Sequence, residues 1–234
     1  MTLSTLTRGL VVGAAGMALL CAAPALAGPI DWTHWTTFTT GATTGTAAGT
    51  AGGVGVSYSG ELENLFANYP SWTPALSYVG GTVGNAPLPS DGIIQLFGAQ
   101  LDPNGAPLVD TITFSKPVTN PVIAIWSLGQ GGSAASFVFP GNEPVTIEAG
   151  GPSAEYGGGS ITLSGNTISG LEGNGTIQLT GTFTSISWTT PQFENWYGFA
   201  VGVVPEPATW ALMLAGFAGL GMALRSRRMR FARA

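Results

Sequence analysis

Residues 122–126 read Val-Ile-Ala-Ile-Trp, an unbroken run of five apolar side chains. Successive side chains of a strand point to opposite faces of the sheet, so a strand without polar residues is buried on both faces. We therefore predict a central strand here, in the core of a β-rich domain.

The segments around this run carry the signals of shorter strands. Residues 111–114 place Ile112 and Phe114 on one face, and residues 197–203 carry an aromatic residue or Val at every second position. Further runs rich in β-branched and aromatic residues lie between turn signals, at Val54–Glu61, Leu76–Val79, Ile93–Phe97, Phe137–Phe139, Val145–Glu148, Ile161–Leu163 and Thr167–Ser169. This spacing predicts an all-β fold over residues 28–203, an antiparallel β-sandwich that resembles a jelly roll.

Two stretches interrupt the pattern. Between Ile177 and Trp188 the apolar parity changes, because Phe183 is odd and Ile186 is even; a bulge or bend near residues 184–185 would keep both sets facing inward. Residues 36–53 are rich in Thr, Gly and Ala and fit either a leading strand or a flexible arm. Turn residues cluster at Asp102-Pro103-Asn104-Gly105, Ser164-Gly165-Asn166 and Glu172-Gly173-Asn174-Gly175.

Length and charge limit the classes of function. The chain has 234 residues, 44% of them hydrophobic, which suits one folded domain with a packed core. Its charge is uneven: twelve acidic residues stand against Lys116 alone between Arg8 and the arginines that begin at Arg225. A body with a net charge of -11 cannot neutralise a run of phosphates, so we predict no nucleic-acid partner.

The N-terminus is typical of a secretory signal peptide. Arg8 precedes an apolar run from Gly9 to Leu20, and Ala25-Leu26-Ala27 forms a small-x-small cleavage site. The run is shorter than the ~20 residues that cross a bilayer, which argues against an anchor. Leu20 before Cys21 argues against a lipoprotein signal. We predict a signal peptide helix over residues 1–27, export by the Sec translocon, and cleavage by signal peptidase between Ala27 and Gly28.

The C-terminus carries a second membrane segment. Val203-Val204-Pro205-Glu206-Pro207 leads into apolar residues 208–224, followed by Arg225, Arg227 and Arg228. Seventeen residues at ~1.5 Å each can just span a thin bilayer as a helix. Because positively charged flanks stay cytoplasmic, residues 28–204 would lie outside, in agreement with the signal peptide.

This order of proline-flanked motif, short apolar helix and arginine cluster resembles the PEP-CTERM sorting signal of Gram-negative bacteria, over residues 204–230. The resemblance implies that an exosortase reads Pro205, Glu206 and Pro207, with Arg225, Arg227 and Arg228 as the stop. It also implies passage through the inner membrane, then removal of the helix and release or attachment at the cell surface or in the extracellular matrix. Exopolysaccharide production and a biofilm matrix are the implied setting. A plain C-terminal anchor behind a proline-rich stalk is the alternative.

Few residues of the body suit catalysis. His34 is the single histidine, and no cysteine remains once Cys21 is removed with the signal peptide. Catalysis by Ser-His-Asp or Cys-His would depend on His34 alone, so we predict that the protein is not an enzyme. Paired carboxylates for polysaccharide hydrolysis stay an alternative, with five candidates: Glu143, Glu148, Glu155, Glu172 and Glu194.

We predict neither a metal site nor a cofactor, with Ca²⁺ as the alternative. Asp102-x-Asn104-Gly105 begins like a Ca²⁺ loop, but it lacks the later bidentate Glu and fits an ordinary turn. Trp126 and Trp188 are core residues by parity, while Tyr69, Trp72 and Tyr78 are candidates for stacking against a sugar. Alternatively, these rings cap the core. The expected role is structural or interactive, in the envelope or matrix, and a polysaccharide-binding module is the alternative.

Overall fold

The computed structural model of the chain describes residues 28–68, 72–141, 143–205 and 216–217. The predicted signal peptide, including Ala27, lies outside the described residues. So does the predicted membrane segment 208–224, apart from Gly216 and Phe217. Among the residues described, no helix has the length and apolar character needed to cross a membrane.

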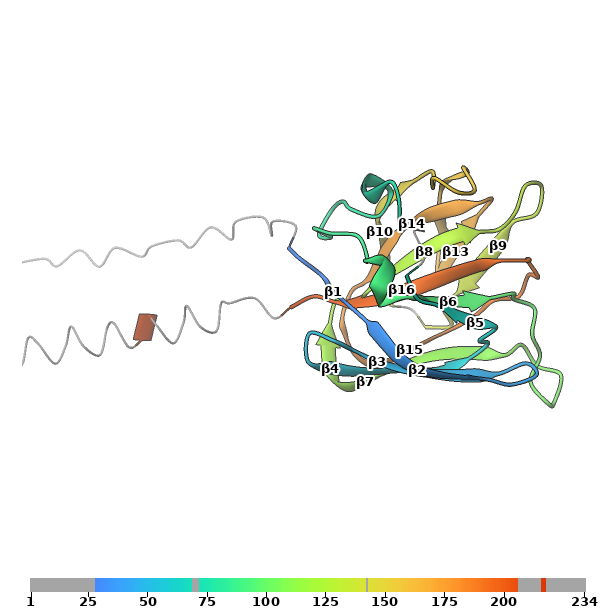
Figure 1. Cartoon of the computed structure of the whole chain (residues 1–234), viewed down its shortest axis with the longest axis horizontal. Coiled ribbons are helices and arrows are strands. Elements are labelled where there is room, and N and C mark those ends of the chain that lie inside the picture. The colour runs from blue at the N-terminus through green and yellow to red at the C-terminus, as the bar shows by residue number, and fades with distance from the viewer. Residues whose placement is uncertain (1–27, 69–71, 142, 206–215, 218–234) are drawn as a thin grey trace, which may run out of the picture.

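Two antiparallel sheets form the body, as the all-β prediction requires (Figure 1). We call the first the covered sheet. Its path is β10 (Val145–Gly151), β14 (Gly173–Leu179), β8 (Val122–Leu128), β16 (Tyr197–Val203), β6 (Ile93–Leu96) and β5 (Asn64–Phe66). Two short strands flank this path: β1 (Asp31–Trp32) pairs with β16, and β11 (Gly159–Ser160) runs parallel to β14.

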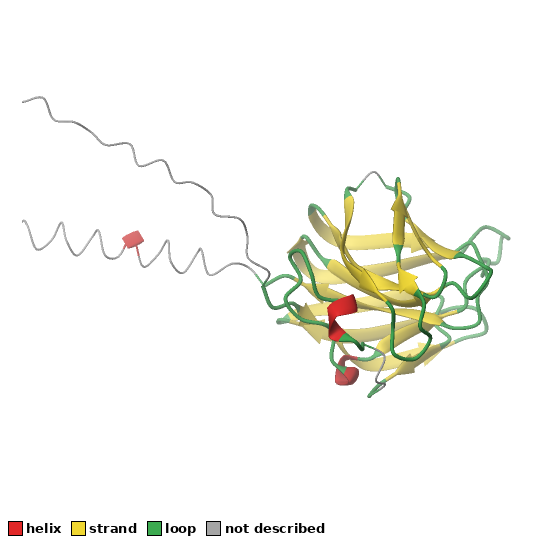
Figure 2. Cartoon of the chain, turned by 90° about the horizontal axis from the view of Figure 1, so that it is seen from above, coloured by secondary structure: helices red, strands yellow, loops and turns green. Residues whose placement is uncertain are grey.

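We call the second sheet the open sheet. Its order is β12 (Thr162–Ser164), β13 (Thr167–Gly170), β9 (Ala135–Val138), β15 (Thr182–Thr189), β7 (Val109–Thr119), β4 (Val54–Gly60), β3 (Gly45–Ala51) and β2 (His34–Thr40). Strands dominate the described chain, and its helical segments are short, as Figure 2 shows. They include the 3-10 turns η1 (Ala75–Ser77) and η2 (Pro89–Asp91).

The main core lies between the two sheets. Ile123, Ile125 and Phe199 enter it from the covered sheet, and Ile112 and Trp188 from the open sheet. The rings of Trp188 and Phe199 meet edge to face with centroids 5.1 Å apart. The prediction that Trp188 is a core residue is confirmed.

A second apolar cluster lies on the other face of the covered sheet. Val122, Ala124, Trp126 and Ala200 point into it. They are covered by the N-terminal segment and by the loop of residues 72–86, which contribute Ile30, Trp32, Trp72, Tyr78 and Val83. Every residue of β8 is therefore buried, which confirms a central strand buried on both faces.

None of the described residues forms such a cover over the outer face of the open sheet. β3 alternates buried and exposed residues along its whole length. One cross-strand row on this face joins Thr39, Thr46, Ser59, Thr111 and Ser187 of five neighbouring strands. Hydroxyl groups bond within the row, with 2.9 Å between the Oγ1 atoms of Thr39 and Thr46.

The bulge expected between Ile177 and Trp188 is present, but this stretch of the chain spans both sheets. The register of β15 against β7 shifts between Phe183 and Ser185, at the expected position. Ile177 and Leu179 lie in β14 of the covered sheet, because the chain changes sheets at residues 180–181. Residues 36–53 form most of β2 and β3, so the leading strand is correct and the arm is not.

The predicted strand Leu76–Val79 is wrong. Its place is taken by η1, where Ser77 N and Tyr78 N bond back to the carbonyls of Pro74 and Ala75. Leu76 is 81% exposed, whereas Tyr78 is fully buried in the second cluster. A single covering turn places these side chains differently from the alternation of a strand.

The predicted turn at Glu172–Gly175 is also displaced. Only Leu171 and Glu172 lie in the bend, and Gly173 already begins β14. A Cβ atom on Gly175 would lie 2.8 Å from Cγ1 of Ile161, so glycine is needed here for close packing rather than for turning.

Candidate functional site

The described chain enters and leaves the sandwich at one point. β1 pairs with the end of β16, with Asp31 opposite Val203 and Trp32 opposite Gly202. Figure 1 shows both segments side by side at the left end of the sandwich. We call this end the exit pole.

The exit pole places the first residue of the predicted sorting motif close to the folded body. Val203 is the last residue of β16, and Pro205 is half-buried two residues later. Gly28 and Pro205 are therefore the predicted processing residues that the structure locates. Ala27, Glu206, Pro207, Arg225, Arg227 and Arg228 lie outside the described residues.

Residues 28–33, here called the N-terminal strap, are fixed beside the exit. Ile30 N donates to Oδ1 of Asn85 at 2.6 Å, and Nδ2 of Asn85 donates to the Ile30 carbonyl at 3.2 Å. Nε1 of Trp32 donates to the Asn85 carbonyl at 3.1 Å. The expected new N-terminus and the start of the sorting motif thus belong to one ordered surface.

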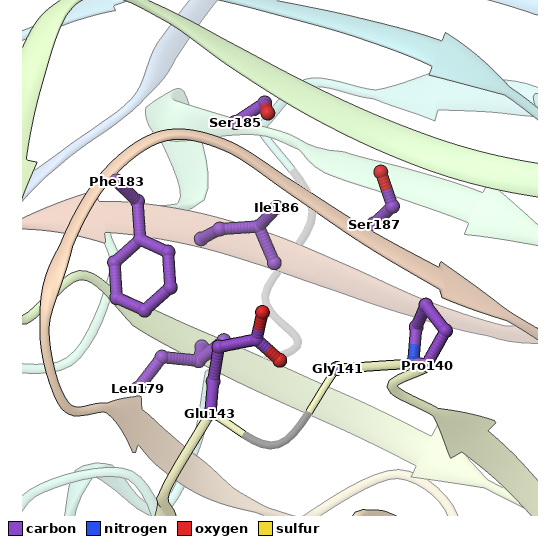
Figure 3. A pocket seen from close by; sticks show the side chains of 8 residues that line it. All are labelled: Pro140, Gly141, Glu143, Leu179, Phe183, Ser185, Ile186 and Ser187. Carbon is purple, nitrogen blue, oxygen red and sulfur yellow. The ribbon is translucent and has the colours of Figure 1, made fainter.

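A hollow of about 180 Å³ opens where β9 and β15 diverge, since Thr189 and Val138 are their one registered pair. In Figure 3, Phe183, Leu179 and Glu143 surround the space, while Ser185 and Ser187 point away on the other side of β15. Glu143 is the sole carboxylate among its described lining residues. The hollow therefore does not show the carboxylate pair that glycoside hydrolysis uses.

Two carboxyl groups that we did not predict as functional meet inside the sandwich. Asp110 is fully buried and Glu61 is 4% exposed. Oδ1 of Asp110 accepts hydrogen bonds from Tyr58 Oη at 2.6 Å and from Glu61 N at 2.8 Å. Gly98 N donates to the carboxylate of Glu61 at 2.7 and 2.9 Å, and Thr190 Oγ1 lies 3.3 Å from its Oε2.

Burial dominates the acidity of this pair. It raises the pKa of Asp110 to about 7, although the hydrogen bonds from Tyr58 and Glu61 N act in the opposite direction. Burial also raises the pKa of Glu61, against the hydrogen bonds of Phe97 and Gly98. The carboxyl group of Asp110 therefore takes up a proton as the pH falls through about 7. The hydrogen bonds of the pair connect β4, β7 and the loop after β6.

Of the five predicted carboxylates, Glu172 and Glu194 come together at Gly129. Glu172 N donates to the Gly129 carbonyl at 3.1 Å. Burial raises the pKa of Glu194 to about 7, the charge of Glu172 adds to this rise, and a hydrogen bond from Gly129 N opposes it. Oε1 of Glu194 accepts from Trp196 N at 2.8 Å, while its buried Oε2 has no hydrogen-bond partner among the described residues.

This carboxyl pair lies beside packed rings rather than beside a cleft. Trp126 and Trp196 meet edge to face at 4.6 Å, and Tyr156 contacts both at 5.3 and 5.4 Å. At these distances the rings fill the space between them. Since Glu194 is 3% exposed, its carboxyl group cannot touch a polymer bound at the surface in this conformation.

The other three carboxylates have separate surroundings. Glu143 lines the hollow described above. Oε2 of Glu148 accepts from Thr82 N at 2.7 Å, and burial raises the pKa of Glu155. The structure does not bring these three together.

The predicted sugar contacts need correction. Trp72 is 3% exposed and Tyr78 is fully buried, and their rings meet edge to face at 5.1 Å. They cover the outer face of the covered sheet, as the alternative expected, and cannot stack against a sugar from this position. Tyr69 lies outside the described residues.

The remaining candidates lie in ordinary positions. His34 is exposed at the start of β2, an edge strand. Oδ1 of Asp102 accepts from Asn104 N at 2.8 Å and from Ala106 N at 2.9 Å, which confirms a turn at this site. Within the described part of the chain, no group of three or more His, Cys, Asp or Glu residues is placed to hold a metal ion.

Residues 203–228 match the family model of the PEP-CTERM protein-sorting motif. The match confirms the resemblance and begins at the last residue of β16. The chain matches no curated protein and no solved structure. The comparisons thus inform on the tail, and the body must be interpreted from its own geometry.

Proposed function

We propose that this chain is the precursor of an exported protein whose tail is processed by an exosortase, and whose β-sandwich serves as a structural or interaction component of the cell surface or extracellular matrix. The observation that carries the proposal is the sorting motif at residues 203–228, which begins where the folded body ends.

The geometry of the exit pole supports processing at this point. Val204 separates the last residue of β16 from Pro205, so the body and the motif are almost continuous. Proline disfavours a helical conformation in the residue before it, so the sequence Pro205-Glu206-Pro207 favours an extended chain, the form that proteases bind. The first strand and the last strand leave the body at the same pole (Figure 1), so both membrane-directed ends would be handled on one side of the domain.

The chemistry of the body supports a role in contacts rather than in catalysis. The outer face of the open sheet presents neutral hydroxyl groups, such as those of Thr46, Ser57 and Thr113. The carboxyl groups with strongly raised pKa values, Asp110 and Glu194, are buried and take part in packing.

Changing Pro205, Glu206 and Pro207 together to Ala tests the processing step. The variant should still lose its signal peptide but should keep its tail, so its mass in the membrane fraction exceeds that of the processed protein. Mass spectrometry of both termini measures this. Pro103→Ala, in an exposed turn far from the motif in sequence, is the control and should be processed normally.

A variant that is trimmed at the usual rate would contradict exosortase processing. The matrix role has its own test, in which cells producing the wild-type chain are washed and fractionated. We expect the processed body at the outer surface or in the matrix. Recovery of the processed body only from the periplasm would contradict that role while leaving the processing step intact.

A further inference from the structure

The two sheets treat their edges differently. β5 and β12, at one end of each sheet, are three residues long. β10, at the other end of the covered sheet, has seven residues, and β2, at the other end of the open sheet, also has seven. The two long edges invite comparison, because an unpaired strand edge is a template for pairing with another chain.

The edge at β10 is protected. η1 and the loop after it pack against β10, and a Cβ atom on Gly80 would lie 2.5 Å from the Glu148 carbonyl. Oε2 of Glu148 holds this loop through Thr82 N at 2.7 Å and Thr82 Oγ1 at 3.0 Å. A charged side chain and a covering loop are two usual means of blocking an edge.

Within the described chain, η2 contacts β2, but residues 36–40 of this edge strand have neither a charged side chain nor a covering loop that buries them. Residues 35–40 read Trp-Thr-Thr-Phe-Thr-Thr, without a charge, a proline or a glycine, and residues 36–40 are all exposed. Within the described chain β3 is the one strand paired with β2. A register shift between Trp35 and Thr37 leaves residues 37–40 in regular pairing with β3.

Phe38 points to a partner of a particular kind. It stands opposite Ala47, which is 4% exposed and belongs to the main core, so Phe38 faces the inner side of the sheet. Yet Phe38 itself is 45% exposed. The edge of the core therefore ends in an apolar ring that the described chain does not cover.

We propose that a second copy of this chain pairs with the first through β2, antiparallel, with Phe38 opposite Phe38 of the second copy. This register places Thr37 opposite Thr39 and Thr36 opposite Thr40, so each side chain meets one of its own kind in size and polarity. Aromatic pairs and Thr pairs across neighbouring strands are both stabilising. The identical strand also gives the interface the two-fold symmetry common to homodimers.

The contact is weak and depends on salt. A strand of five residues is only ~17 Å long, at ~3.4 Å per residue. Pairing along this length buries much less surface than the ~800 Å² per partner of a stable complex. The strand pair itself is neutral, whereas each body carries a large negative charge. Screening of this long-range repulsion should therefore strengthen the dimer as salt rises.

The geometry also determines which copies can meet. β2 starts directly after the N-terminal strap, at the exit pole, and its turn into β3 lies at the other end of the sandwich (Figure 1). In an antiparallel pair the second copy is rotated by about 180° relative to the first, so the two exit poles point in opposite directions. Two copies held by their tails in one membrane therefore cannot pair through β2. Processed copies can pair, and so can copies on two facing surfaces. This restriction on which copies pair rests on the proposed function.

A cysteine at position 38 tests the pairing directly. The exported chain has no thiol once the signal peptide is gone, so Phe38→Cys introduces a single one. Residues directly opposite in an antiparallel pair have Cα atoms about 4.5–5.5 Å apart, within the range a disulfide bridges. With oxygen and copper phenanthroline as oxidant, we expect most of the detergent-solubilised protein to form a disulfide dimer. Thr113→Cys, exposed on an inner strand of the same sheet, is the collision control and should stay monomeric.

Sedimentation provides a second readout without cysteine chemistry. The wild-type chain should associate more strongly as protein concentration and salt rise. Phe38→Lys should abolish this association while the melting temperature stays within a few degrees of wild type. Equal cross-linking at positions 38 and 113, or wild-type association in Phe38→Lys, would overturn the proposal. Neither result bears on whether the tail is processed.

Discussion

The covered sheet and the open sheet are both antiparallel, yet their sequences differ. β8, β14 and β16 of the covered sheet are buried at every residue. β3 of the open sheet alternates strictly, and β4 keeps its exposed residues at every second position from Ser57. The difference comes from the layer of chain over the covered sheet, formed by the N-terminal strap and residues 72–86.

The comparison shows what a continuous apolar strand can mean. Such strands are typical of parallel sheets, whose helices cover both faces. Here loops perform the covering, so an antiparallel strand acquires the same pattern. A run such as Val122–Trp126 therefore indicates burial on both faces, and it leaves open whether helices, loops or a partner provide the cover.

The largest predicted effect comes from placing a carboxylate on each outer face. Ala124→Asp in β8 introduces a charge at a fully buried position, where Ala124 contacts the second cluster. A buried unpaired charge should remove about 4 kcal/mol or more of the free energy of unfolding, enough to prevent folding of many domains. Urea denaturation, or the yield of folded protein, measures this loss.

Thr113→Asp is the matched change on the open sheet. Thr113 is exposed between Ser57 and Ser185, so the new carboxylate stays in water. The free energy of unfolding should change by no more than about 0.5 kcal/mol. Comparable losses for both variants would mean that the open sheet is also covered.

The next effect concerns the proton bound by Asp110, a buried residue of β7 in the open sheet. Burial raises the pKa of Asp110 to about 7, whereas an unfolded Asp titrates near pH ~3.9. The folded state binds the proton more tightly, so its stabilising contribution is complete below pH ~4 and is lost as the pH rises to about 7. For one proton the slope approaches about 1.4 kcal/mol per pH unit. Urea denaturation between about pH 4.5 and 7.5 measures it.

Asp110→Asn should reduce this slope by up to about 1.4 kcal/mol per pH unit, because the amide does not titrate. The fold should persist, because the amide oxygen still accepts from Tyr58 and Glu61 N. Glu61 and Glu194 also have raised pKa values and keep their own contributions. Glu194→Gln, in the loop that leads into β16 of the covered sheet, should reduce the slope separately. An unchanged slope in Asp110→Asn would contradict a proton on Asp110.

The sequence predicts the strands better than the sites, and Asp110 shows why. Its parity matches Ile112 and Phe114, so the alternation of β7 already places it on the inner face. That signal could have identified Asp110 as buried. Its partners could not be predicted, because Glu61 N lies 49 residues away and local patterns do not determine which strands become neighbours.

The covering layer shows the same limit. Val122–Trp126 predicts that something covers β8, but the covering residues come from β1 and from an irregular loop. The composition of Leu76–Val79 predicts a strand, whereas the segment is an irregular covering loop that contains η1. For Trp72 and Tyr78 the sequence leaves both a sugar contact and a place over the core open, and the structure shows the latter. In both cases apolar residues were recognised correctly, while their destination depended on contacts distant in sequence. The jelly-roll connectivity of the sheets stays a prediction.

A smaller effect should follow from loosening the covering layer. Asn85→Ala removes both side-chain hydrogen bonds to Ile30, with Oδ1 as acceptor at 2.6 Å and Nδ2 as donor at 3.2 Å. Leaving half-buried backbone groups of the strap without partners should cost about 1–3 kcal/mol. Amide hydrogen exchange should become faster in the strap and in β1, while β7 of the open sheet keeps its protection.

Asn104→Ala is the matched control, since Asn104 is exposed in the turn after Asp102 and contacts no covering layer. Its effect on the free energy of unfolding should stay within about 0.5 kcal/mol. If exchange in β7 accelerated as much as in the strap, the covering layer and the open sheet would unfold as one unit. This result would contradict the view that the covering layer stabilises the covered sheet separately from the open sheet.

The smallest effect tests the hydroxyl row on the open sheet. The Oγ1 atoms of Thr39 and Thr46 are 2.9 Å apart and exposed, so water competes for both groups. In a double-mutant cycle with Thr39→Val and Thr46→Val, the coupling energy should be about 0.5 kcal/mol or less. Valine keeps the shape and β propensity of threonine, so the strands themselves persist. A coupling above about 1.5 kcal/mol would show that water is excluded from this face. The open sheet would then be covered after all, by a partner that remains bound in the purified protein.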